Sequence, residues 1–164
     1  MTTDVPWSGI LDVRMNSIRQ ANPEDVTAIK ALVSETLRRC VVEDEESHGT
    51  IFGEICTVID SWVECPGDTV HLVCERDEEI VGVVLIAHYE RMKLLFVHPE
   101  CQKGGIGTAL LERALTVCRL SGESRRVTLN SSSYAAGFYR KYGFVANGEP
   151  ENRPGGCVPL AIDL

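Results

Sequence analysis

The stretch of residues 94–111, LLFVHPECQKGGIGTALL, constrains the fold most, because its hydrophobic pattern changes from strand to helix within one short segment. The apolar run 94–97 is short enough for a buried strand, and Pro99 ends it because proline has no N–H group for a strand ladder. After the glycine-rich residues 102–108, apolar residues recur at helical spacing as far as Cys118. The predicted order is therefore strand, glycine loop, helix.

This order predicts a binding site for an anion. Glycines let the backbone approach a ligand closely, and the first turn of a helix offers free N–H groups and a positive dipole end. A pyrophosphate is the anion that we expect. A Walker loop is excluded because Lys103 precedes the glycines. A dinucleotide fingerprint is incomplete, because Gly105 and Gly107 are followed by Leu110 where the third glycine belongs.

The composition is typical of one globular domain, with 164 residues, of which 44% are apolar and 24% charged. A net charge of −8 disfavours nucleic acid as a partner, because such binding relies on basic patches. The seven cysteines form no C-x-x-C pair and the four histidines are dispersed, so we expect no metal. The sequence has no apolar run long enough to span a membrane and no leader segment. We therefore expect no membrane partner and no secretion, and we expect a cytoplasmic protein.

The first half of the chain predicts a short extension followed by a strand and two helices. Residues 1–14 show no sustained period, and a first strand is expected at 17–20. Asn22 and Pro23 suit the N-cap and first turn of a helix that runs to about residue 39. The acidic residues 43–49 are interpreted as a solvated loop, and a second helix is expected from Ile51 to about Pro66.

The second half predicts a sheet with one crossover connection. Strands are expected at 70–76, 80–87 and 92–97, the second of them buried on both faces. A helix to about residue 120 then leads to a strand at 126–130, and because this is a crossover, strands 92–97 and 126–130 should be parallel. A helix at 134–142 and strands at 143–146 and 157–163 complete the chain.

A second motif suggests a family. Residues 135–144, AAGFYRKYGF, are similar to the A-x-x-F-Y-x-x-x-G-F pattern of the GNAT acyltransferase superfamily. Gln102, Gly105 and Gly107 also match the acetyl-coenzyme A loop of that superfamily, Q/R-x-x-G-x-G/A. The resemblance implies a mixed α/β fold: a six- to seven-stranded twisted sheet flanked by about four helices. Its order is strand, two helices, three strands, helix, strand, helix, two strands, within residues 15–164.

The resemblance also implies acetyl-coenzyme A as cosubstrate. Backbone groups of residues 95–97 would pair with the pantetheine arm like an added strand, and residues 102–108 would hold the pyrophosphate. Asn130 and Ser132 would reach the pantetheine or the substrate, although the common family spacing would place an asparagine at 132. The residues implied in coenzyme binding are Leu95, Phe96, Val97, Gln102, Lys103, Gly104, Gly105, Ile106, Gly107, Thr108, Asn130 and Ser132.

Tyr139 matches the superfamily's tyrosine that lies near the coenzyme sulfur. The implied mechanism is direct transfer: a neutral amine attacks the thioester carbonyl, a backbone N–H near Leu95 supports the oxyanion, and Tyr139 protonates the leaving thiolate. A phenol with a pKa of about 10 carries its proton at neutral pH. The general base stays open among Glu75, His88, Glu90 and water.

Two functions follow from this reading. The first is an N-acetyltransferase acting on a primary amine of a small molecule or a peptide. The alternative is a non-catalytic acyl-coenzyme A sensor or interaction module of the same fold. The retained tyrosine favours the enzyme, whereas the acceptor matches no pattern in the sequence. The resemblance also leaves a homodimer open.

Overall fold

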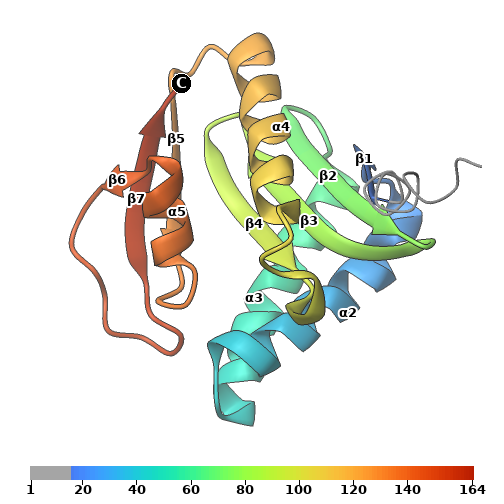
Figure 1. Cartoon of the computed structure of the whole chain (residues 1–164), viewed down its shortest axis with the longest axis vertical. Helices are drawn as coiled ribbons and strands as arrows, with labels where there is room; N and C mark the ends of the chain where they lie inside the picture. The colour runs from blue at the N-terminus through green and yellow to red at the C-terminus, as the bar shows by residue number, and fades with distance from the viewer. Residues whose placement is uncertain (1–15) are drawn as a thin grey trace, which may run out of the picture.

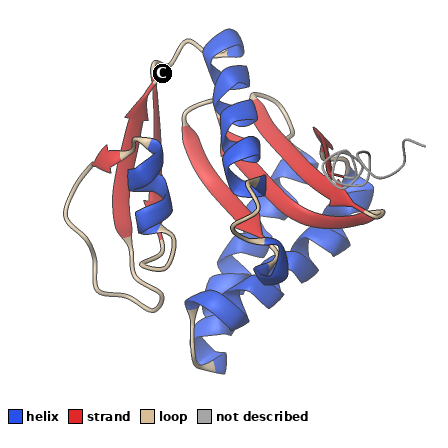
Figure 2. Ribbon diagram, viewed as in Figure 1, coloured by secondary structure: helices blue, strands red, loops and turns tan. Residues whose placement is uncertain are grey.

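The computed structural model describes residues 16–164 and shows one mixed sheet between two layers of helices (Figures 1 and 2). The predicted extension 1–14 lies outside the described residues. The strands are β1 (Asn16–Gln20), β2 (Thr69–Arg76), β3 (Glu79–Ala87), β4 (Arg91–Val97), β5 (Arg126–Ser131), β6 (Val145–Ala146) and β7 (Val158–Asp163). The helices are α2 (Val26–Thr36), α3 (Glu45–Glu64), α4 (Ile106–Ser121) and α5 (Ala136–Tyr142), with short turns η1 (Pro23–Asp25), η2 (Leu37–Val41) and η3 (Pro99–Cys101).

The sheet has the strand order β1-β2-β3-β4-β5-β7-β6. All neighbouring strands are antiparallel except β4 and β5, which are parallel as the crossover through α4 predicts. The order of elements along the chain is also the predicted one, and the mixed α/β fold class is confirmed.

The central strand β3 separates two apolar cores. It is buried from Val81 to Ile86, which confirms that both of its faces are covered. Because neighbouring side chains of a strand point to opposite faces, Val84 packs in the core beneath α4 and α5, whereas Val83 packs in the core of α2 and α3. Figure 1 shows α4 and α5 on the near face of the sheet and α2 and α3 on the far face.

Helix α3 begins earlier than the sequence predicts. The acidic segment 43–49 is expected as a solvated loop, but the helix starts at Glu45. The Asp44 side chain caps it by accepting a hydrogen bond from the Ser47 N–H group at 2.8 Å, and acidic residues in the first turn suit the positive helix end. His48 is buried rather than solvated, with Nε2 3.1 Å from the Ser34 hydroxyl oxygen.

The sheet opens between β4 and β5. The two strands are paired at the start of β4, where Arg91 lies opposite Thr128 in the middle of β5, and they diverge towards their carboxyl ends (Figure 1). Strand β4 also contains a bulge, because its partners on β3 change register and leave Lys93 as an extra residue between Met92 and Leu94. The divergence leaves the later part of β4 with a backbone edge that β5 does not cover.

Candidate active site

A cavity of about 850 Å³ occupies the opening between β4 and β5. Its walls come from both sides of the sheet: α5 and the β4–α4 loop on one side, and α2, α3 and the segment before β7 on the other. The cavity therefore passes through the sheet. Its volume is within the range of small-molecule and cofactor sites.

Nearly all residues that the sequence assigned to coenzyme binding line this cavity. The lining members are Leu95, Phe96, Val97, Gln102, Lys103, Gly105, Gly107, Thr108, Asn130 and Ser132, together with the predicted catalytic residue Tyr139. Gly104 is exposed beside the cavity, and the Ile106 side chain points into the apolar core. Only the backbone of these two residues could take part in binding.

The glycine loop has the geometry of an anion site. Lys103 and Gly105 both have left-handed backbone conformations, with φ of +66° and +90°, and Gly105 caps helix α4. Its carbonyl oxygen accepts a hydrogen bond from the Ala109 N–H group at 2.9 Å. The preceding N–H groups, on residues 106–108, thus belong to the open first turn of a 16-residue helix, where a phosphate can accept hydrogen bonds.

The side chain of Gln102 bridges the open ends of β4 and β5. Its Nε2 donates to the Val97 carbonyl oxygen at 3.0 Å, and its Oε1 accepts from the Tyr134 hydroxyl at 2.6 Å. Tyr134 belongs to the loop after β5, so this pair of bonds joins two loops that the divergence separates. Sequence reasoning missed Tyr134, which is partly exposed and precedes the recognised helix motif.

Tyr139 lies on α5 with a buried phenol ring, only 5% exposed. Its ring packs edge-on against Phe138 and Phe144, and its hydroxyl lies 3.7 Å from the Met92 sulfur, next to the bulge of β4. Burial raises the pKa of the Tyr139 phenol well above its usual value, because the phenolate would be poorly solvated. The group is therefore a neutral proton donor at the cavity wall.

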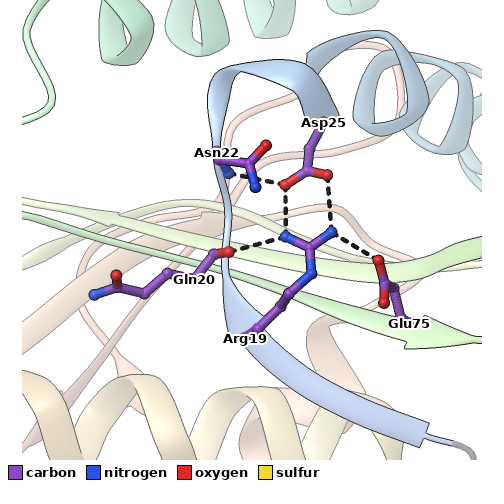
Figure 3. A network of polar contacts seen from close by, with 5 residues as sticks. All are labelled: Arg19, Gln20, Asn22, Asp25 and Glu75. Carbon is purple, nitrogen blue, oxygen red and sulfur yellow. Dashed lines mark hydrogen bonds and ion pairs between the residues drawn. The ribbon is translucent and has the colours of Figure 1, made fainter. Parts of the chain in front are cut away.

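None of the three side chains considered as general base lines this cavity. Glu75 lies on β2, where its carboxylate accepts from Arg19 at 2.7 Å in the network that also contains Asp25 (Figure 3). His88 and Glu90 are exposed in the turn between β3 and β4, at the end where β4 and β5 are still paired.

One carboxylate does reach the cavity, and sequence reasoning missed it. Glu54 of α3 is the only acidic residue among the described residues of the lining. It forms an ion pair with Arg153, which precedes β7 and also lines the cavity. The two residues are 99 positions apart in the chain, so no local pattern could have joined them.

The described residues contain neither a cluster of metal ligands nor a membrane-spanning helix. Within residues 16–164, no three His, Cys, Asp or Glu side chains gather in a way that could hold a metal ion. Across the same part of the chain, every helix is too short or too polar to cross a membrane.

The geometry agrees with a comparison of sequences. The family described as the acetyltransferase (GNAT) domain matches residues 30–159, which is most of the chain. The chain belongs to this GNAT family. Peptidyl-lysine N-acetyltransferase YjaB from Salmonella typhimurium is 38% identical to this GNAT chain over 79 residues, which are 48% of the chain and 51% of the relative. The aligned region thus spans about half the length of that relative.

Solved structures support the same GNAT fold. The GCN5-related N-acetyltransferase from Rhodopseudomonas palustris superposes with a TM-score of 0.77 at 19% identity, covering 90% of this chain and 95% of the other. The PaiA N-acetyltransferase from Thermoplasma acidophilum, solved in complex with coenzyme A, gives 0.75 at 18% identity, covering 91% and 99%. At such identities the likeness concerns the fold, and it confirms the predicted GNAT architecture.

Proposed function

We propose that this protein is an acetyl-coenzyme A-dependent N-acetyltransferase that moves an acetyl group directly to a primary amine. The observation that carries the proposal is the cavity through the sheet, which has an anion-binding loop at one side and the buried Tyr139 phenol in its wall. Membership of the GNAT family supports the reaction class. The name of the Salmonella relative supports a peptide amine as one acceptor, and a small-molecule amine is the other.

The coenzyme would lie across the opening of the sheet. The N–H groups of the glycine loop would bind its pyrophosphate, and Lys103 would add a positive charge. Residues 95–97 pair with β3 along one edge, and their other edge borders the cavity. That edge would hold the pantetheine arm by strand-like hydrogen bonds, with Asn130 and Ser132 on the opposite wall.

The transfer then needs two groups of this chain at the thioester. A backbone N–H of β4 near Leu95, just after the bulge, would support negative charge on the carbonyl oxygen while the amine nitrogen attacks the carbonyl carbon. When the carbon–sulfur bond breaks, Tyr139 would donate its proton to the leaving sulfur. The raised pKa of the phenol keeps this proton in place until negative charge develops on the sulfur.

A charge reversal in the glycine loop tests coenzyme binding. Lys103 is exposed, so Lys103→Glu should leave the fold intact while placing a negative charge beside the pyrophosphate. Because a charge-assisted hydrogen bond contributes about 1.5–3 kcal/mol, we expect the Kd for acetyl-coenzyme A to rise roughly tenfold or more in a calorimetric titration.

Lys141→Glu is the matched control, because Lys141 is exposed on α5, lies outside the cavity lining and changes the net charge equally. It should bind like the wild type. Equal affinity of both variants would contradict the assignment of the loop. If the wild type binds acetyl-coenzyme A but releases no free coenzyme when amines or lysine peptides are added, the non-catalytic sensor is favoured instead.

A further inference from the structure

The half of the cavity that faces α2 and α3 has apolar walls. Helix α2 continues into the short π-helix η2, and π-helical segments recur at functional sites. The apolar residues of this half are Leu37, Val41, Ile51, Ile55, Phe96 and Pro154. Such walls suit an acceptor with an aliphatic stem rather than an acceptor with a strongly hydrated stem.

The net charge of the cavity lining is positive, whereas that of the whole chain is negative. The chain carries a net charge of −8, yet among the described lining residues three are cationic, Lys93, Lys103 and Arg153, and Glu54 alone is acidic. Because Lys103 would face the pyrophosphate, an acceptor with several positive charges would meet one carboxylate, Glu54, and repulsion from Lys93 and Arg153.

Glu54 forms only a weak ion pair, with Arg153. Its Oε2 lies 3.4 Å from Nη2 of Arg153, with the side chains 60% and 45% exposed. An ion pair of this kind between exposed groups has little net strength. Its members come from α3 and from the segment before β7, so the pair lies in the half of the cavity that faces α2 and α3. An incoming cation can displace the arginine.

We infer that Glu54 binds the ammonium group of the acceptor and that Arg153 occupies Glu54 until the acceptor arrives. The inference rests on the proposed function and names its acceptor class: a primary monoamine at the end of an apolar stem, such as an alkylamine or a lysine side chain. Glu54 is a docking residue for the charged amine, whose nitrogen loses its proton to water before it attacks.

A substitution of Glu54 tests the docking role. In Glu54→Gln, the KM for n-hexylamine and for a lysine-containing peptide should rise about two- to fivefold, because an ion pair to an exposed carboxylate is lost. The kcat and the Kd for acetyl-coenzyme A should stay near the wild-type values. Glu54→Asp should recover part of the acceptor affinity, which a merely structural role would not explain.

Glu64→Gln is the matched control, because Glu64 is exposed on the same helix and lies outside the cavity lining. It should leave every parameter unchanged. The partner substitution Arg153→Gln should act in the opposite direction, lowering the acceptor KM by about two- to fivefold, since it removes a competitor whose ion pair is weak.

The outcomes separate this inference from the proposed function. Unchanged acceptor KM in Glu54→Gln, or a kcat/KM for spermidine that exceeds that for n-hexylamine, would overturn the inference while leaving the acetyltransferase proposal in place. Binding of acetyl-coenzyme A without acetylation of any monoamine would also overturn it. Failure of the wild type to bind acetyl-coenzyme A would instead contradict the proposed function.

Discussion

The environment of Tyr139 makes it a proton donor that holds its proton. The aromatic neighbours Phe138 and Phe144 and the Met92 sulfur replace water around its hydroxyl, and this raises the pKa of the phenol. A group of this kind does not ionise at neutral pH. In the proposed mechanism it would release this proton only as the carbon–sulfur bond breaks and negative charge develops on the sulfur.

Tyr139→Phe should therefore affect turnover and little else. The phenyl ring keeps the aromatic packing, whereas the loss of the acid should lower kcat by about 10² or more. The Kd for acetyl-coenzyme A should stay near the wild-type value in a calorimetric titration. Tyr142→Phe, on the same helix but outside the cavity lining, is the control and should keep full activity. A kcat of Tyr139→Phe close to that of the wild type would reject the role.

At the scale of elements, the position of helix α4 depends on a close approach to β3. Gly82 of β3 faces the first two turns of the helix, and a Cβ atom there would lie 2.8 Å from Leu110 Cδ1 and 3.0 Å from Ile106 Cγ2. Because Leu110 is fully buried, it has little room to move. The glycine therefore sets how closely the open end of α4, and with it the glycine loop, approaches the sheet.

Gly82→Ala should force α4 away from β3. Overpacking of this kind costs about 1–3 kcal/mol, and we expect the free energy of unfolding in urea to fall by that amount. The affinity for acetyl-coenzyme A should fall as well, because the first turn of α4 moves.

Gly137→Ala is the contrasting substitution at this scale. Gly137 is exposed on α5, and a Cβ atom there would meet no neighbouring atom within 4 Å, so alanine should stabilise the helix by about 0.5–1 kcal/mol. Equal unfolding free energies for the two variants would show that the close approach of α4 is not tight.

At the scale of the whole molecule, a buried histidine connects stability to pH. His71 of β2 is buried edge-on against Trp62 of α3, with ring centroids 4.2 Å apart. Within the described chain, neither ring nitrogen has a hydrogen-bond partner. Burial lowers the pKa of His71 from 6.5 to about 4, and the nearby Asp25 opposes this only in part. The folded protein therefore holds the ring neutral.

The free energy of unfolding should fall as the pH falls from 6.5 to about 4. In that window the unfolded chain takes up a proton that the folded chain does not, and the loss integrates to at most about 3 kcal/mol. His71→Leu should remove this part of the pH dependence in urea titrations at pH values of about 7.5, 5.5 and 4.5, the first above the window and the other two within it. Parallel pH profiles of the two proteins would contradict the assignment.

The sequence by itself determined the order of elements, the crossover and the glycine loop before the start of a helix. These features depend on local rules: hydrophobic period, capping residues, and the backbone freedom of glycine next to a helix start. The start of α3, which the sequence reading placed too late, also has a local cause, since Asp44 could have been recognised as an N-cap ahead of two acidic residues.

Only the tertiary structure decided which side chains share the cavity. The three candidate bases face other parts of the molecule, whereas Glu54 and Arg153 meet across 99 positions of chain. The bulge at Lys93 and the divergence of β4 from β5 arise from pairing with neighbouring strands. Local patterns specify the backbone of each element, but contacts between distant elements depend on how those elements pack, and that packing forms the half of the cavity that faces α2 and α3.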